Sequence, residues 1–214
     1  MKPKLLIDFN NVRANGLNGV VSFRLEAGSC LIVPITDEQE GVTFIRLLLG
    51  FQSPESGEVS LLDTVPCSLD TAAQLALRSK IGIIYSNGGH LSNLNAWENL
   101  MLQSEYHGNI DARELRENAQ QALQEIGFSG ELTALPAQFG LVQKRQLALA
   151  RAMLSDSLVL VFQSTADGIG GKEHQLMLQA ISKLLTQKPI AGAIFLTTRP
   201  ESLEELNITS IITK

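Results

Sequence analysis

Short apolar runs alternate with polar or glycine-containing turns along the chain, and longer stretches with helical spacing of apolar residues separate several of them. Apolar runs of strand length predict β-strands at 5–9, 20–25, 30–34, 58–62, 81–85, 158–162, 193–197 and 208–212. Helical periodicity predicts helices at 42–49, 71–79, 111–126, 142–154 and 172–185, with Asp111 as the cap of the third. Buried strands separated by helices indicate an α/β fold with a mainly parallel sheet.

The same pattern suggests how the chain is organised. Residues 1–214 contain 44% hydrophobic residues, which is enough for one globular domain. The early strands, within about residues 1–35, predict an N-terminal β layer. The two helices predicted between residues 90 and 154 indicate a helical subdomain inserted into the α/β core.

Composition and charge exclude several classes of partner. The chain has 17 Lys and Arg residues against 22 Asp and Glu residues and has no basic run, which argues against nucleic-acid binding. Its apolar runs are far shorter than the ~20 residues that span a bilayer, and Asp8 comes too early for a signal-peptide core, so we expect a cytoplasmic protein. Cys30 and Cys67 have no nearby histidine, and the sequence indicates no metal site.

Five stretches resemble segments of ABC transporter ATPases, and they occur in the order found in that family. Residues 44–59 resemble the segment after the Walker A loop, and residues 81–85 together with 93–100 resemble the segments on either side of the Q-loop. Residues 147–153 are similar to the helix behind the signature motif, and residues 158–161 occupy the place of the Walker B strand. The resemblance implies the P-loop NTPase-like fold of an ABC nucleotide-binding domain.

The residues that handle ATP in that family are largely replaced. A P-loop, G-x-x-x-x-G-K-[ST], uses glycines so that backbone N–H groups reach the phosphates, a lysine to neutralise charge and a hydroxyl to hold Mg²⁺. In the matching window only Thr43 keeps its family type. The replaced positions of this window are Ile35, Glu40, Gly41 and Val42.

The other motifs depart from the family in the same way. The Q-loop glutamine, the signature motif, the Walker B aspartate, the glutamate after it and the switch histidine all have substitutes. These substitutes are Ser86, then Gly140, Leu141 and Val142 within the signature, then Phe162, Gln163 and Thr198. An amide such as that of Gln163 cannot act as a general base.

Asp37, Glu38 and Glu40 stand where the triphosphate would lie. Like charges about 4 Å apart repel by about 1 kcal/mol in water and by several times that near a protein surface, so the loop is expected to disfavour ATP. Two interpretations of this acidic loop are a solvated turn without a role, which we favour, and a loop that binds a basic side chain or a metal.

The resemblance and the replacements together predict a pseudo-ATPase that is not an enzyme, needs no cofactor and is a structural or regulatory subunit of a membrane transport complex. It would work at the cytoplasmic face beside an integral-membrane subunit, with an intact ABC ATPase or as a dimer. Candidate docking residues are Ser86, Asn87 and Trp97, although core packing explains Trp97 equally well. The alternative is an ATPase that binds and hydrolyses ATP with Mg²⁺ through a rearranged site.

Two further implications concern partners. The segment at residues 92–107 resembles ABC importers and lipid-transport systems of the Mla or Mce type. ABC sites are composite, each joining the Walker A loop of one subunit to the signature of the other. Because both motifs are replaced here, pairing with an intact ATPase would impair both sites of the pair.

Overall fold

The computed structural model describes residues 4–107, 111–188, 190–206, 208, 210 and 211, with the side chains of 103–107, 210 and 211 left out. These residues gather into two compact units, each of which is described by itself. Unit 1 consists of Met1–Ile83, Ser157–Ser164 and Ile190–Lys214. Unit 2 consists of Ile84–Asp156 and Thr165–Pro189.

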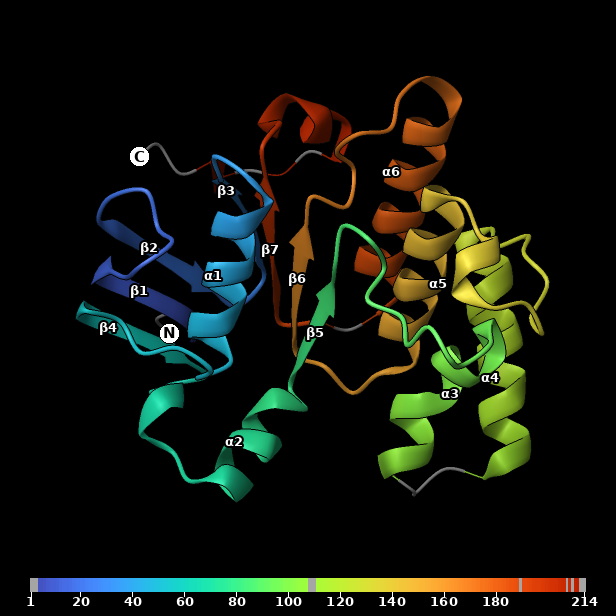
Figure 1. Cartoon of the computed structure of the whole chain (residues 1–214), viewed down its shortest axis with the longest axis horizontal. Coiled ribbons are helices and arrows are strands. Elements are labelled where there is room, and N and C mark those ends of the chain that lie inside the picture. Colours follow the sequence, from blue (N-terminus) through green and yellow to red (C-terminus); the bar gives the residue numbers. More distant parts are fainter. Residues whose placement is uncertain (1–3, 108–110, 189, 207, 209, 212–214) are drawn as a thin grey trace. The chain divides into compact units, whose positions relative to one another are not determined.

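Unit 1 contains a three-stranded antiparallel sheet in the order β2-β1-β4 (Figure 1). Its strands are β1 (Leu5–Arg13), β2 (Val21–Glu26) and β4 (Ser56–Leu61). Strand β2 alternates strictly between buried and exposed positions, as expected for a sheet with one face in the core. On that buried face Phe9 of β1 stacks on Phe23 of β2 with ring centroids 4.6 Å apart.

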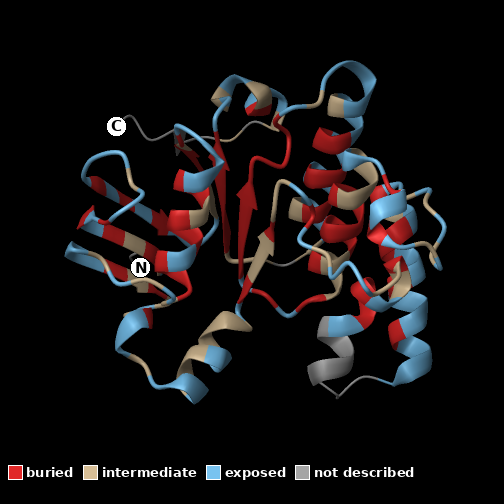
Figure 2. Cartoon of the chain, in the orientation of Figure 1, coloured by how far each residue is buried: buried red, intermediate tan, exposed pale blue. Residues whose placement is uncertain are grey.

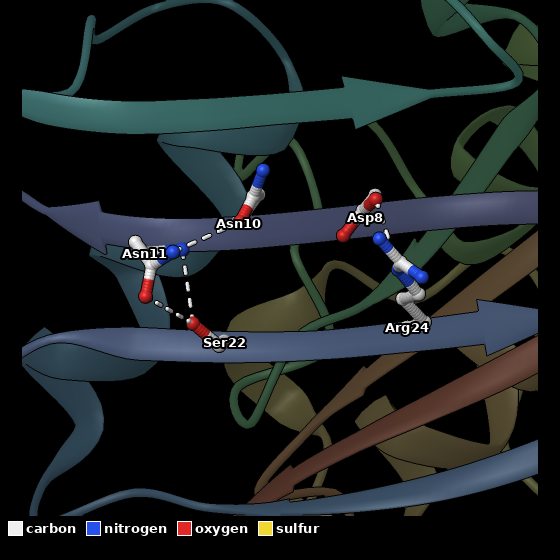
Figure 3. Close-up of polar contacts among 5 residues, drawn as sticks. All are labelled: Asp8, Asn10, Asn11, Ser22 and Arg24. Atoms are coloured by element: carbon white, nitrogen blue, oxygen red, sulfur yellow. Dashed lines mark hydrogen bonds and ion pairs between the residues drawn. The ribbon is translucent and has the colours of Figure 1, made fainter.

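A bulge in β1 lies opposite Ser22 of β2 (Figure 3). Asn11 adopts a φ of 50°, and its backbone N–H donates to Ser22 Oγ at 2.9 Å while Ser22 Oγ donates to Asn11 Oδ1 at 3.3 Å. Arg24 and Asp8 form an ion pair at 3.1 Å further along the same two strands. The bulge bends the end of β1 and so sets where the β1–β2 turn, residues 14–20, begins.

Unit 1 also contains a five-stranded sheet in the order β5-β6-β7-β3-β8. Its pairs β6–β7, β7–β3 and β3–β8 are parallel, which confirms the predicted mainly parallel core. Strands β6 and β7 are buried along their whole length (Figure 2). The bounds are β3 (Ser29–Pro34), β5 (Ile81–Ile84), β6 (Val159–Gln163), β7 (Gly192–Thr197) and β8 (Ser210–Ile211). The remainder of the predicted last strand includes positions 209 and 212, which lie outside the described residues.

The placement of the strand at 30–34 in the N-terminal β layer is wrong. This strand is β3, which pairs with β7 and β8 in the parallel sheet, and β4 takes the third place in the antiparallel layer. The reason is burial: Leu31, Ile32 and Val33 are buried in succession, which suits a strand covered on both faces rather than one with an exposed face.

Helix α1 (Glu38–Leu48) follows β3 and contacts both β4 and β6. It begins four residues before the predicted start at Val42, because the Asp37 side chain accepts a hydrogen bond from the backbone N–H of Glu40 at 2.8 Å and caps the helix there. Asp70 caps α2 (Thr71–Arg78) in the same way. The described part of unit 1 also includes the 3-10 helices η1 (Pro66–Ser68) and η3 (Pro200–Leu206).

In its described residues unit 2 contains four α-helices. They are α3 (Ala96–His107), α4 (Ala112–Ile126), α5 (Leu141–Leu154) and α6 (Gly171–Gln187), with the 3-10 helix η2 (Pro136–Gln138) before α5. Helix α5 contacts α3, α4 and α6, so it forms the centre of the unit. None of the helices in the described part of the chain is both long enough and apolar enough to cross a membrane.

Two details of these helices differ from the sequence-based expectation. Helix α3 was missed, although Asn95 and Glu98 form a reciprocal pair of hydrogen bonds, at 2.7 and 2.9 Å, that mark a helix start. Asp111 precedes α4 as predicted, but its side chain makes no capping hydrogen bond.

Candidate functional site

In unit 1 the window at 35–43, which corresponds to the phosphate-binding loop, is taken up by a short turn and the first residues of α1. The backbone N–H of Ile35 donates to the carbonyl oxygen of Thr197 at 2.9 Å. The N–H groups of Glu40 and Gly41 donate to the side chain and the carbonyl oxygen of Asp37. Backbone donors that a phosphate would need are therefore engaged within the chain.

Glu40 is buried, with 2% of its surface exposed. Its Oε2 accepts hydrogen bonds from the N–H and the hydroxyl of Thr36, at 2.6 and 2.9 Å, and its Oε1 accepts one from the N–H of Asn18 at 2.9 Å. The favoured interpretation of the acidic loop as a solvated turn is wrong for this residue, because a carboxylate with three donors can be buried. Glu38, two residues earlier, is exposed.

Gly41, at the position of the P-loop lysine, packs closely against two other replaced positions. A Cβ built on Gly41 would lie 3.0 Å from Ile35 Cδ1 and 3.2 Å from Gln163 Cγ. Gln163 ends β6 with 2% of its surface exposed, and its Nε2 donates to the carbonyl oxygen of Glu38 at 3.0 Å. The structure thus brings Ile35, Gly41 and Gln163 together, as the family order implies.

Thr43 is buried within α1, with Val42 half-buried beside it. The Thr43 hydroxyl donates to the carbonyl oxygen of Gln39 at 3.1 Å. Gly16 of the β1–β2 turn lies directly over this hydroxyl, since a Cβ on Gly16 would overlap Thr43 Oγ1. The one retained hydroxyl of the loop is therefore covered.

Phe162 lies within β6, and Thr198 directly follows the neighbouring parallel strand β7. Phe162 stacks on Phe195 of β7 with centroids 4.5 Å apart and an angle of 5° between the ring planes. Both rings are buried, so the side chain at the Walker B position packs in the hydrophobic core. Thr198 is exposed just after β7.

In unit 2 the loop at 85–90 contains Ser86, the Q-loop position, and is held by two arginines of α5. Arg145 donates from Nε to the carbonyl oxygen of Ser86 and from Nη1 to that of Asp167, both at 2.7 Å. Arg151 donates to the carbonyl oxygens of Gly88 and Gly89, both at 3.1 Å. Burial lowers the pKa of Arg151 from its ordinary value.

His90 closes the same loop. Its Nε2 lies 2.8 Å from the carbonyl oxygen of Lys144, to which it donates in the tautomer with hydrogen on that nitrogen. Burial lowers the pKa of His90, and the charges of Arg151 and Lys144 lower it further against the raising effect of the Lys144 carbonyl. Our sequence reasoning missed His90, Arg145 and Arg151. For Arg145 the available signal was its position, with Gln146, beside the apolar residues 147–150.

The signature positions form the start of α5. The N–H of Gly140 donates to Oε1 of Gln143 at 3.1 Å. Leu141 is 40% exposed and Val142 is half-buried. Branched side chains thus occupy the first turn of a helix whose N–H groups contact phosphate in the family.

The candidate docking residues have different exposures. Asn87 is exposed, and its Oδ1 accepts a hydrogen bond from the N–H of Gly89 at 2.9 Å, whereas Ser86 is half-buried. Trp97 is half-buried at the start of α3, with the Arg116 guanidinium 5.8 Å from its ring centroid. Within the described residues, no group of three or more His, Cys, Asp or Glu side chains could hold a metal ion.

In this arrangement the residues do not fit a nucleoside triphosphate with Mg²⁺. The Glu40 carboxylate occupies the donors of Thr36 and Asn18, and Gly16 covers the hydroxyl of Thr43. Entry of a triphosphate at this loop requires those contacts to open.

The family model described as ABC transporter matches residues 42–164, from α1 to the residue after β6. The chain belongs to the ABC transporter family. It resembles solved ABC cassettes over more than nine tenths of its length, which confirms the predicted fold. One is cbiO1 of Clostridium perfringens, part of the transporter complex cbiONQ, with a TM-score of 0.73 and 15% identity over 91% of this chain and 79% of that one. Another is a dimeric ATP-binding cassette in a post-hydrolysis state bound to ADP and Pi, with a TM-score of 0.73 and 18% identity over 92% of this chain and 90% of that one.

Three curated relatives of this ABC family member are named as ATP-binding proteins. The Nod factor export ATP-binding protein I of Rhizobium etli is 28% identical over 90% of this chain and 60% of its own length. The methionine import protein MetN 2 of Lactiplantibacillus plantarum is 31% identical over 56% of this chain and 34% of its own length. The phospholipid transport protein MlaF of Haemophilus influenzae is 22% identical over 79% of this chain and 58% of its own length. The chain therefore spans between a third and three fifths of these relatives.

The expectation of a pseudo-ATPase that is not an enzyme is wrong. Its relatives are named for ATP binding, and one structural relative holds the hydrolysis products ADP and Pi. The expectation that no nucleotide is used is not supported for the same reason. It rested on side chains alone, whereas P-loop folds bind phosphate largely through backbone N–H groups, which side-chain replacements do not remove.

Proposed function

We propose that this chain is the ATP-binding subunit of a membrane transport complex, located at the cytoplasmic face beside an integral-membrane subunit. The family match over residues 42–164 carries this proposal, because it runs from the helix that follows the phosphate loop to the residue after the Walker B strand. Support also comes from relatives that are named for export, import and phospholipid transport.

The nucleotide step is the second part of the proposal. The subunit binds and hydrolyses ATP with Mg²⁺ through a site rearranged from the closed arrangement described above. Thr43, the one position of the window that keeps its family type, and the backbone of the 35–40 loop are the groups available for it, whereas Val42 stands at the Mg²⁺-holding position of the motif.

Calorimetric titration of the purified chain with Mg-ATP tests this step. We expect binding with a dissociation constant in the micromolar to millimolar range, weakened at least several-fold by Thr43→Val, which removes the hydroxyl and keeps the shape. Thr186→Val, which removes a hydroxyl on the exposed part of α6, is the matched control. Absence of heat with millimolar Mg-ATP, together with no ATPase activity when the membrane subunit is added, would refute the nucleotide step.

The membrane subunit is proposed to dock near the loop at 85–90 and Trp97. The exposure of Asn87 and the hold of α5 on this loop support a rigid docking loop. The test is cross-linking of Asn87→Cys to the membrane subunit in reconstituted vesicles. The native exposed Cys67 in the parent chain is the control, and equal cross-linking of both chains would argue against this surface.

Self-association is proposed for the same subunit, since the structural relatives include a dimeric cassette. Sedimentation of the chain with and without Mg-ATP tests it. We expect a nucleotide-dependent dimer. A chain that stays monomeric in both conditions while an added intact ATPase binds it would instead support a mixed pair.

A further inference from the structure

The Glu40 carboxylate joins two segments that are far apart in the sequence. Its partners are the N–H and hydroxyl of Thr36, in the loop before α1, and the N–H of Asn18, 22 residues earlier in the β1–β2 turn. All three distances lie between 2.6 and 2.9 Å, and the residue is 98% removed from solvent. Hydrogen bonds to a carboxylate are among the stronger ones in proteins.

These partners are the kinds of group that bind a phosphate. A phosphate oxygen in a loop of this fold accepts hydrogen bonds from backbone N–H groups and hydroxyls near a helix N-terminus. The Glu40 oxygens accept from the N–H and the hydroxyl of Thr36, just before α1, and from the N–H of Asn18 in the β1–β2 turn. The carboxylate is thus an internal anion that uses the loop's own donors.

The same contact holds the β1–β2 turn over α1. Gly16 lies against the Thr43 hydroxyl, and Gln52 Nε2 donates to the carbonyl oxygen of Asn15 at 2.9 Å. The turn has the means to move: its residues 15, 16 and 18–20 are exposed, and Gly16 and Gly19 have φ angles of 91° and 95°. Exposed segments of this kind open at low free-energy cost without disturbing the core.

We propose that Glu40 is an autoinhibitory latch: its carboxylate occupies the donors of the phosphate loop and keeps the β1–β2 turn closed, so that a phosphate-bearing ligand enters only when Glu40 leaves. This deepens the proposed function and rests on it for the identity of the ligand. The latch itself is a property of the ligand-free chain, so it can be measured without knowing the ligand.

Hydrogen exchange measures the latch without any ligand. Glu40→Ala removes the acceptor, and we expect the amides of Asn18 and Thr36 to exchange about ten-fold faster or more, the ratio that corresponds to one lost charged hydrogen bond. Glu38→Ala is the matched control, since it removes the same charge from the same helical turn at an exposed position. Should Glu40→Ala fail to fold, Glu40→Gln keeps the shape and should shift the same amides in the same direction. Unchanged exchange of both amides in the folded variants overturns the latch.

Binding of inorganic pyrophosphate and of Mg-ATP measures the inhibition. We expect both to bind the Glu40→Ala chain at least ten-fold more tightly than the Glu38→Ala chain. Equal affinities, or no pyrophosphate binding by either variant, overturn the inhibitory role. Tight pyrophosphate binding by Glu40→Ala with no Mg-ATP binding or hydrolysis by the native chain supports the latch and overturns the proposed nucleotide step, so the two proposals fail separately.

Discussion

The ring of Phe162 lies parallel to that of Phe195, at a centroid distance of 4.5 Å, in the middle of the parallel sheet. The Walker B aspartate of the family would stand in this apolar place. A carboxylate there has no partner among the two rings, and an isolated buried charge is costly. Because the Phe162 ring packs on Phe195 in the core, the type of residue at position 162 affects the stability of the core.

Phe162→Ala should lower the free energy of unfolding by about 3–5 kcal/mol, because it removes a buried ring and its stacking partner's contacts. Phe162→Asp should cost more and yield little folded protein. Urea denaturation checks both. Leu158→Ala, at a position 40% exposed just before β6, is the control and should cost about 1 kcal/mol or less. Tolerance of Asp at 162 would show that this site is reached by solvent or a cation.

Asp37→Ala should destabilise the chain by about 1 kcal/mol through loss of the α1 cap. Asp111→Ala provides the comparison, because Asp111 also precedes a helix but its side chain makes no capping bond, and its loss should cost at most about 0.5 kcal/mol. Denaturant titration of both variants measures their free energies of unfolding. Equal losses of stability in the two variants would contradict a specific helix cap at Asp37.

Arg145→Ala should loosen the loop at 85–90 and cost about 3 kcal/mol, since it leaves the carbonyl oxygens of Ser86 and Asp167 without that donor. Limited proteolysis should then cut near Asn87. Arg113→Ala is the control: its ion pair with Glu117 is exposed, and its loss should change stability by about 0.5 kcal/mol or less. Equal protease resistance of the two variants would rule out the proposed hold on the loop.

His90 should make stability fall in mildly acidic solution. Burial lowers its folded-state pKa below the ordinary value of 6.5, so the folded chain favours the neutral ring. The unfolded chain then binds more protons, and stability decreases as the pH falls through 6.5 toward the lower folded pKa. Unfolding free energies measured between pH 8 and pH 5 should show a shallower dependence for His90→Gln. If the stability of His90→Gln depends on pH in the same way as that of the native chain, His90 is not the group that causes the loss of stability in acid.

Gly16→Ala and Gly19→Ala should separate crowding from backbone strain. Both glycines have φ near 90°, but a Cβ at 16 would overlap the Thr43 hydroxyl while a Cβ at 19 meets no atom within 4 Å. We expect Gly19→Ala to cost about 1 kcal/mol and Gly16→Ala clearly more, with faster exchange of the Asn18 amide. Equal costs would mean that the turn is not packed on α1.

The apolar pattern of the sequence predicted most elements of the fold, because runs such as those of β6 and β7 are buried in succession and leave little ambiguity. It misplaced β3, since a run of six residues does not reveal which sheet it joins. It missed α3, whose apolar residues lack a clear stripe. The start of α1 depended on the Asp37 cap, a side-chain contact rather than a hydrophobic period.

The candidate site was predictable as a set of positions but not as a set of contacts. Family order assigns Ile35, Gly41 and Gln163 to one site, and the structure brings these three residues together. The burial of Glu40 was not foreseeable, because its donors include the N–H of Asn18, which no local pattern connects with it. Charge counting treated three acidic residues alike, whereas Asp37 caps a helix, Glu38 is exposed and Glu40 is enclosed.

Close packing around Gly41 also limits how this sequence can change. A lysine at 41 needs room that Ile35 Cδ1 and the Gln163 side chain now occupy, with Cβ distances of 3.0 and 3.2 Å. Restoring one family residue at a time thus meets a steric penalty that disappears only when its neighbours change as well. The three positions form a co-adapted set, and the path back to an ordinary phosphate loop runs through combined substitutions whose effects are strongly non-additive.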